Sequence, residues 1–289
     1  MAPTTAAQLV QGVEQLVSLP EACFRVNEMI EDPSSSAADF AAVITQDADL
    51  SARLLRLVNS AYYALPGPVD TISRAVTIVG TRELRDLAVM TAACDLFQGI
   101  PADMFNMSDF WHYAVATGIF ARNLAAQCSA LHAERLFVMG VLHDVGRLVI
   151  MQHLGQQARD ILLLAQDKAE LLSYAESEVL GFTHAEVGYE LTRTWQLPES
   201  IGNAIRFHHQ PAAAQSYRLE TALIHIAQLM AHNTVWGEGP QQALGEIDVS
   251  VWGVTGLSPD SCRKCGSEAG QQIMGMFSVL MGADHSSAL

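Results

Sequence analysis

The chain has 289 residues, of which 50% are hydrophobic and 16% charged, so it can bury a large core and is not a disordered chain. Its formal net charge of −15 makes general nucleic-acid binding and docking on anionic lipid unfavourable. We expect a cytoplasmic protein, because the chain shows no long apolar run, no basic-then-apolar start and no disulfide framework among its five cysteines.

Along most of the chain, apolar residues recur three and four positions apart, which is the spacing of helices, while alternating strand patterns are scarce. Ser36 followed by Asp39 predicts a capping box at a helix start. Thr183 predicts a cap on a helix that begins with His184, and Pro198 opens a further helix. We therefore predict an all-α protein in two packed helical lobes.

The helix-breaking residues between the predicted helices divide the chain into three parts. Residues 1 to about 104 form an N-terminal helical lobe, and residues 105 to about 236 form a second lobe that carries most of the histidines. Residues 237–289 form a C-terminal extension. It begins irregularly at the turn Gly237-Glu238-Gly239-Pro240 and ends in a helix from about 259 to 281.

The most informative pair of residues is His143 and Asp144, an imidazole beside a carboxylate within an apolar stretch. Such neighbours are natural metal ligands, but side chains one residue apart on a helix point about 100° apart. The pair can therefore share a target only near a helix end. Gly146 is compatible with a turn or a close helix contact at that point.

Other histidines stand where partner helices could carry them to the same point in the second lobe. These are His112, His184, His208 and His209. A closing carboxylate is missing, since the last polar-lined helix offers Gln228 instead. His225 and His232 share a helix face with Gln228 and are alternative replacement ligands.

Two blocks of motifs, covering roughly residues 18 to 235, resemble the HDOD family, a bacterial signalling family related to the HD and HD-GYP phosphohydrolases. The first block comprises Asp47-x-x-Leu50, then Leu57-x-Asn59-Ser60-Ala61-x-Tyr63, and then Ala75-x-x-x-Val79-Gly80. The second comprises Trp111-His112, His143-Asp144-Val145-Gly146, His184-x-x-x-Gly188 and His208-His209-x-Pro211. The resemblance implies an all-α fold with an HD-like half.

The resemblance also implies a metal site with one or two divalent ions, of iron, manganese, nickel or zinc. The positions that match the ligands of the related enzymes are His112, His143, Asp144, His184, His208 and His209. Asp144 and Arg147 are the candidate catalytic residues, with Arg147 at the place where those enzymes often have a lysine. Arginine stays protonated and cannot shuttle a proton, although it can clamp a phosphate.

We expect a regulatory domain without strong catalysis, which acts through signalling protein partners or a bound ligand, in the manner of a response regulator without its receiver. The alternative is a metal-dependent phosphohydrolase that acts on a nucleotide or cyclic dinucleotide. A third reading is a nucleotide-binding sensor. The GYP motif is absent, so we expect no appreciable cyclic-di-GMP hydrolysis. Metal affinity should fall below about pH 6.5, where an ordinary histidine takes up a proton.

Overall fold

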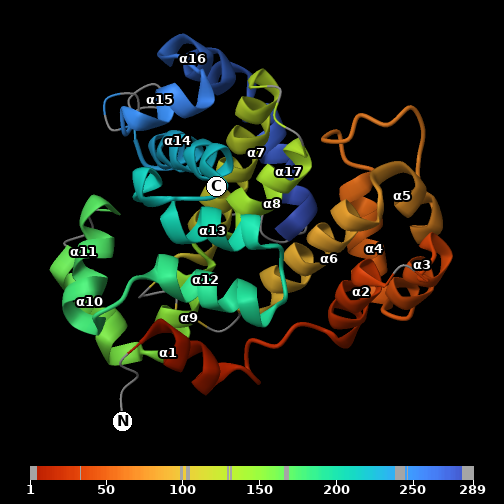
Figure 1. Ribbon diagram of the computed structural model, residues 1–289, viewed down its shortest axis with the longest axis horizontal. Helices are drawn as coiled ribbons and strands as arrows, with labels where there is room; N and C mark the ends of the chain where they lie inside the picture. Colours follow the sequence, from red (N-terminus) through yellow and green to blue (C-terminus); the bar gives the residue numbers. More distant parts are fainter. Residues whose placement is uncertain are drawn as a thin grey trace.

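The computed structural model describes residues 5–281 apart from 33, 98–99, 102–104, 129, 131, 166–168, 238–244 and 246 (Figure 1). Within these residues every regular element is helical, which confirms the all-α prediction. The predicted boundary at 104 and most of the turn at 237–240 lie outside the described residues. Among the described helices, none is both long and apolar enough to span a membrane.

Five helices form the N-terminal lobe, which lies to one side of the molecule in Figure 1. They are α2 (Glu21–Glu31), α3 (Ala37–Thr45), α4 (Ala48–Val58), α5 (Ile72–Val79) and α6 (Thr81–Leu96). The predicted capping box at the start of α3 is confirmed, with Asp39 N–H donating to Ser36 Oγ at 3.2 Å and Ser36 N–H donating to Asp39 Oδ2 at 3.0 Å. A polar side chain thus begins α3 where the sequence places it.

The second group of helices, here called the histidine lobe, runs from α7 to α14. Its members are α7 (Met107–Gln127), α8 (Ala133–Leu142), α9 (Val145–His153), α10 (Gly155–Ala165), α11 (Ala169–Leu180), α12 (His184–Thr194), α13 (Glu199–Phe207), the short 3₁₀ helix η1 (Pro211–Ala213) and α14 (Arg218–Val235). The long helix α7 packs against α8 and α14 at the centre, and much of its surface is buried.

Three further helices complete the described chain: α15 (Ser250–Thr255), α16 (Pro259–Glu268) and α17 (Gly270–Met281). The single helix predicted over about 259–281 is therefore wrong, since it is two helices that meet at the buried Ala269. Glycine at 270 is a weak helix former, and the break there lets α17 turn to pack on both α7 and α4.

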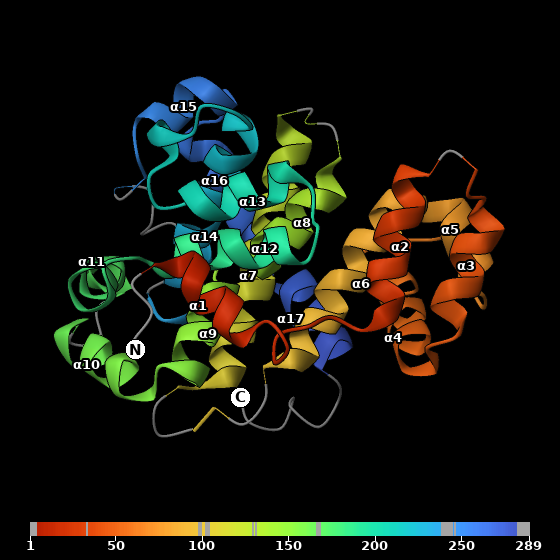
Figure 2. The same ribbon diagram turned by 60° about the horizontal axis from the view of Figure 1, so that its bottom comes forward.

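The first helix, α1 (Ala6–Val13), packs against α12 of the histidine lobe, although the sequence places it within residues 1–104 (Figure 2). The segment after it is anchored by Trp195, whose indole N–H donates to the carbonyl of Val17 at 2.9 Å. The division of the chain at 104 and 236 stays a prediction. Helix α1 belongs to the predicted N-terminal part by sequence but packs on the histidine lobe.

A buried polar network joins the two lobes. Asp86 of α6, 1% exposed, accepts from Arg85 Nε at 2.6 Å and from Arg135 Nε of α8 at 3.1 Å. Arg85 also donates to Asn27 Oδ1 at 3.0 Å, and Asn27 Nδ2 donates to the carbonyl of Trp195 at 2.9 Å. The start of α8 and the end of α12 are thereby fixed to the N-terminal lobe. The histidines described next lie at the opposite ends of these two helices.

Candidate metal site

His143 and Asp144 lie at the break between two helices, as the sequence predicts. His143 ends α8 and Asp144 begins α9. Gly146 makes the neighbouring helix contact possible, because a Cβ at this position would lie 2.1 Å from the carbonyl oxygen of His184 and 2.6 Å from the amide nitrogen of Gly188. Helix α12 thus approaches α9 backbone to backbone and brings His184 onto Asp144.

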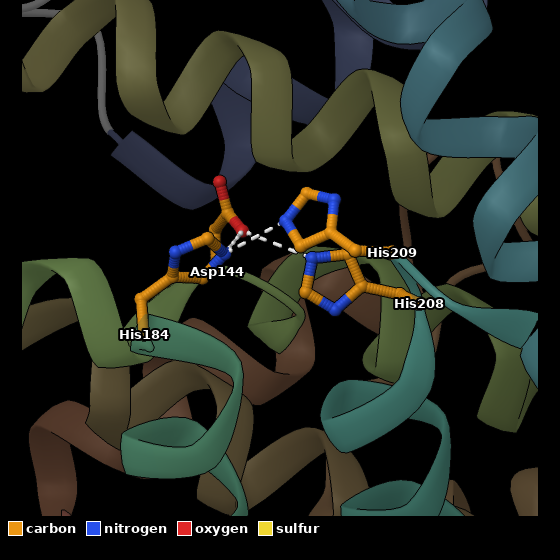
Figure 3. A group of neighbouring side chains, drawn as sticks. All are labelled: Asp144, His184, His208 and His209. Carbon is orange, nitrogen blue, oxygen red and sulfur yellow. Dashed lines mark hydrogen bonds and ion pairs between the residues drawn. The ribbon is translucent and has the colours of Figure 1, made fainter. Parts of the chain in front are cut away.

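Asp144, His184, His208 and His209 form a cluster around the Asp144 Oδ1 atom (Figure 3). His184 Nε2 lies 3.1 Å from it and His208 Nε2 lies 3.4 Å from it. His209 Nε2 is 3.0 Å from His184 Nε2. The donor atoms of Asp144, His184, His208 and His209 all lie within 4.8 Å of one another.

Helix ends present these histidines. His184 is the first residue of α12, and the predicted cap by Thr183 is confirmed as a capping box with Glu186. His208 ends α13, and His209 follows it. At a helix end the side chain is free of the constraint that separates neighbours by 100°, so two helix ends and one break between helices converge on a single carboxylate.

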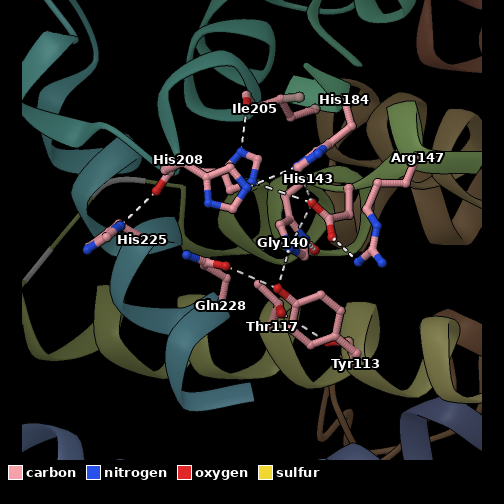
Figure 4. A network of polar contacts seen from close by, with 12 residues as sticks. Tyr113, Thr117, Gly140, His143, Arg147, His184, Ile205, His208, His225 and Gln228 are labelled. Atoms are coloured by element: carbon pink, nitrogen blue, oxygen red, sulfur yellow. Dashed lines mark hydrogen bonds and ion pairs between the residues drawn. The ribbon is translucent and has the colours of Figure 1, made fainter. Parts of the chain in front are cut away.

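The Nδ1 atoms of three histidines each lie next to a hydrogen-bond acceptor, and this fixes the tautomer of the ring (Figure 4). A carbonyl or a carboxylate can only accept, so each of these Nδ1 atoms must carry a proton. The pairs are His143 with the carbonyl of Gly140 at 2.7 Å, His208 with the carbonyl of Ile205 at 2.6 Å, and His184 with Glu176 Oε2 at 2.6 Å. Histidines that bind metals are held in this way, with Nε2 left for the ion.

Two buried atoms of the cluster, Asp144 Oδ1 and His208 Nε2, have no hydrogen-bond partner among the described residues. Facing lone pairs repel one another and are costly when buried, unless a cation or proton lies between them. Two atoms about 2.1 Å from one ion at a tetrahedral angle are about 3.4 Å apart. The spacings of 3.1 and 3.4 Å from Asp144 Oδ1 therefore suit a shared metal ion.

Charge inside the cluster is divided between the carboxylates and one imidazole. Burial alone would raise the pKa of Asp144, but His143 and His184 hold it well below its ordinary value. Burial alone would lower the pKa of His184, yet Glu176 and Asp144 raise it to about 9. Burial lowers the pKa of His143 to about 4. Without a metal, His184 therefore carries a proton at neutral pH.

Arg147 is paired with Asp144 of the cluster through one nitrogen of its guanidinium. Its Nη1 lies 3.0 Å from Asp144 Oδ2, and its guanidinium stacks over Phe105 at 5.5 Å from the ring centroid. Burial would lower the pKa of Arg147, but Asp144 raises it. Arg147 therefore neutralises the oxygen of Asp144 that does not face the histidines.

His112 does not join the other five residues that the sequence predicts to converge. Its ring packs edge-on against Phe277 of α17, with 5.4 Å between the ring centroids. The next residue, Tyr113, faces the cluster instead, with its hydroxyl 3.0 Å from His143 Nε2. Successive residues of a helix point about 100° apart, so His112 and Tyr113 face different neighbours. The packing of α7 against α8 and α14 sets the rotation of the helix about its axis and therefore which of the two faces the cluster.

Gln228 lies near the cluster, as the sequence predicts, and contacts the Tyr113 hydroxyl through Oε1 at 3.1 Å. His225 is not placed to replace a missing ligand. Its Nδ1 donates to the carbonyl of His208 at 2.7 Å and its Nε2 accepts from the amide of Asp248 at 3.1 Å. His232 packs against Trp236, with 5.2 Å between the ring centroids.

The sequence does not predict two residues of the site, Tyr113 and Glu176. Glu176 is fully buried on α11 and also accepts from the backbone N–H of His184, at 2.8 Å. A signal was available, because Glu176 stands between Leu172 and Val179 on the apolar face of its helix. A buried carboxylate needs a partner, and His184 supplies it.

Comparisons with known proteins agree with this architecture. The HDOD domain model matches residues 16–211. A solved structure from Shewanella amazonensis, described as a "Putative phosphohydrolase", is 27% identical with a TM-score of 0.76, covering 96% of this chain and 98% of that one. An HDOD domain protein of unknown function from Geobacter sulfurreducens is 24% identical with a TM-score of 0.72, covering 96% and 97%.

A relative by sequence is an uncharacterized protein of Treponema pallidum (strain Nichols), 31% identical over 242 residues. The match covers 83% of this chain and 46% of the relative. The chain thus spans about half the length of that relative.

Proposed function

Because this chain belongs to the HDOD family, we propose that it is a regulatory protein whose cluster holds one divalent metal in a structural role. Asp144, His184, His208 and His209 are its ligands. It acts through protein partners with little or no catalysis of its own. Its five cysteines are free thiols, which supports a place in a reducing cytoplasm, and its acidity disfavours nucleic acid as a partner.

The observation that carries this proposal is that the ligand set is closed. Structural zinc-type sites use four protein donors, whereas catalytic sites keep a position open for water or substrate. Asp144, His184 and His208 are 3%, 1% and 0% exposed. Only His209 reaches the surface, with its Nε2 turned inward to His184. A substrate phosphate has little access to an ion held among these four.

Without metal, the proton of His184 lies among these donor atoms, and a bound ion would take its place as the positive charge. The protein's own part is to hold the ligands in place from three directions. Asp144 comes from the start of α9, His184 from the start of α12 and His208 from the end of α13. Binding of the ion therefore ties these three helices together, and α12 continues to Trp195 at the lobe interface.

A metal-dependent phosphohydrolase is the second candidate, favoured by the 27% identity to the Shewanella amazonensis protein and by the ligand chemistry of the cluster. In this reading His209 marks the edge at which a nucleotide or cyclic dinucleotide would enter. The pairing of Arg147 with Asp144 and the neutral side chain of Gln228 both disfavour it.

Elemental analysis of the purified full chain tests the metal site. We expect about one ion of zinc, iron, manganese or nickel per chain. His184→Gln should lose that ion, while His112→Gln should keep it, because His112 lies against Phe277. Equal loss in both variants, or no ion in the wild type after loading with each metal, contradicts the proposal.

Assays of the metal-loaded chain separate the regulatory protein from the enzyme. With cyclic-di-GMP and with simple nucleotides, we expect turnover below ~1 per second, the low end of ordinary enzyme rates. Faster turnover that is lost in Asp144→Asn would establish the phosphohydrolase instead. Tight binding of a nucleotide without turnover would indicate a nucleotide sensor.

A further inference from the structure

The Tyr113 hydroxyl lies between two groups that compete for its proton. It is 3.0 Å from His143 Nε2 and 3.1 Å from Gln228 Oε1 (Figure 4). Tyr113 is buried in α7, His143 ends α8, and Gln228 projects from α14. The three side chains form one buried chain of contacts beside the four-donor cluster.

Counting protons decides the direction of these contacts. His143 Nδ1 donates to the carbonyl of Gly140, so the neutral ring has only a lone pair at Nε2. The single proton of Tyr113 is therefore needed by His143. Gln228 then satisfies the tyrosine oxygen by presenting its amide NH₂, since the oxygen and nitrogen of an amide exchange places when it rotates by 180°. The chain of donors runs from Gln228 through Tyr113 to His143.

We propose that the Tyr113 hydroxyl donates its proton to His143, as long as residue 228 does not compete for that proton, and so keeps His143 from binding the metal and fixes a four-coordinate site. This inference rests on the proposed metal site. The distance to Asp144 does not exclude His143, because its Nε2 lies 3.6 Å from Asp144 Oδ1, close to the ~3.4 Å expected for two ligands of one ion, although His143 is outside the group of four whose donor atoms all lie within 4.8 Å of one another. The lone pair of His143 is already occupied by the Tyr113 hydroxyl, and a metal would have to displace that hydrogen bond.

Gln228 has a property that a carboxylate lacks. A carboxylate only accepts hydrogen bonds, so at position 228 it would take the proton of Tyr113 and leave His143 Nε2 bare. Glutamate has nearly the shape of glutamine. Gln228→Glu therefore changes the direction of the donor chain with little change in packing, and Gln228→Met removes the amide without competing for the proton.

Visible spectra of the Co²⁺-loaded full chain provide the test, because four-coordinate Co²⁺ absorbs much more strongly than five-coordinate Co²⁺. We expect a strong four-coordinate spectrum for the wild type. Tyr113→Phe and Gln228→Glu should both lower the intensity by roughly twofold or more, as His143 becomes a fifth ligand. Gln228→Met should keep the wild-type spectrum.

Two controls isolate the role of His143. Tyr62→Phe removes another buried tyrosine hydroxyl, on a ring that packs against Phe137 and Arg122 and not against the cluster residues, and should leave the spectrum unchanged. Tyr113→Phe and Gln228→Glu, each combined with His143→Gln, should return to four-coordinate absorption, which separates His143 from a carboxylate at position 228 as the fifth ligand. Unchanged spectra in both Tyr113→Phe and Gln228→Glu overturn the inference while the metal site itself stands. Failure of the wild type to bind Co²⁺ overturns the metal site.

The ¹⁵N NMR signals of the histidine rings in the wild-type chain test the same inference without a variant. Addition of Zn²⁺ should shift the ¹⁵N signals of Nε2 in His184, His208 and His209, because these atoms would bind the ion. The Nε2 signal of His143 should keep its position. A shift of His143 comparable to the other three would show that the Tyr113 hydroxyl does not withhold it.

Discussion

Glu176 accepts two hydrogen bonds from the same residue, His184, one from its backbone N–H at 2.8 Å and one from its ring Nδ1 at 2.6 Å. The first bond fixes the start of α12, and the second fixes the tautomer and direction of the ring. One buried carboxylate on α11 thus orients the imidazole of His184, the histidine of the cluster whose pKa is raised.

At a pH above about 9, where His184 has lost its proton in both proteins, the isosteric change Glu176→Gln should weaken metal binding by about 10- to 100-fold, the usual effect of losing such a supporting group. The amide carries no charge and can no longer hold His184 firmly. Competition with a chromophoric chelator measures the affinity. Glu178→Gln, at an exposed position on the same helix, is the matched control and should bind metal like the wild type. Equal affinities for both variants would contradict a supporting role for Glu176.

Metal affinity should rise with pH as long as His184 must lose a proton to bind. The pKa of this residue is raised to about 9, so the dependence should extend well above the pH of about 6.5 expected from sequence. We expect a roughly tenfold gain in affinity between pH 7 and pH 8, the slope for release of one proton. In Glu176→Gln, which removes the main cause of the raised pKa, the dependence should become shallower. A flat profile in the wild type would show that His184 is already neutral.

The same raised pKa predicts the opposite trend for stability without metal. A group whose pKa is higher in the folded state stabilises the fold below its unfolded pKa of about 6.5, and this stabilisation is lost as pH rises through about 9. The free energy of unfolding of the metal-free chain, measured in urea, should therefore fall between pH 6.5 and 9.5. His184→Gln should lack this component of the fall.

Gly146→Ala should destabilise the fold by ~1–3 kcal/mol or more, because the added Cβ meets the backbone of His184, which cannot turn aside as a side chain could. Gly12→Ala in α1 is the matched control, since no atom lies within 4 Å of the new Cβ. Alanine is the better helix former, so this variant should be more stable by ~0.5–1 kcal/mol. Thermal unfolding distinguishes the two signs.

Asp86→Ala should destabilise the fold by ~3–5 kcal/mol, because Arg85 is buried and would lose its carboxylate partner. Asp95 also pairs with an arginine, Arg53, but is 47% exposed. Asp95→Ala should therefore leave the free energy of unfolding nearly unchanged. Similar losses in the two variants would mean that the network between the lobes is not specially stabilising.

Features that depend on local chemistry were determined by the sequence itself. Helix starts at Ser36 and Thr183 follow from hydrogen bonds between residues three positions apart, which need no tertiary partner. The helix break at His143 and Asp144 follows from the demand that two adjacent side chains share one target. The need for a glycine at 146 follows from the close approach that such a site requires.

Only the tertiary structure decided which side chains complete the site. His112 and Tyr113 are equally polar neighbours on α7, and the rotation of that helix against α8 and α14 turned the tyrosine inward. Glu176 belongs to no motif, and its role arises only because α11 places it beside the start of α12. Helix phase and the pairing of distant helices are set by packing over whole surfaces, which no local pattern of residues contains.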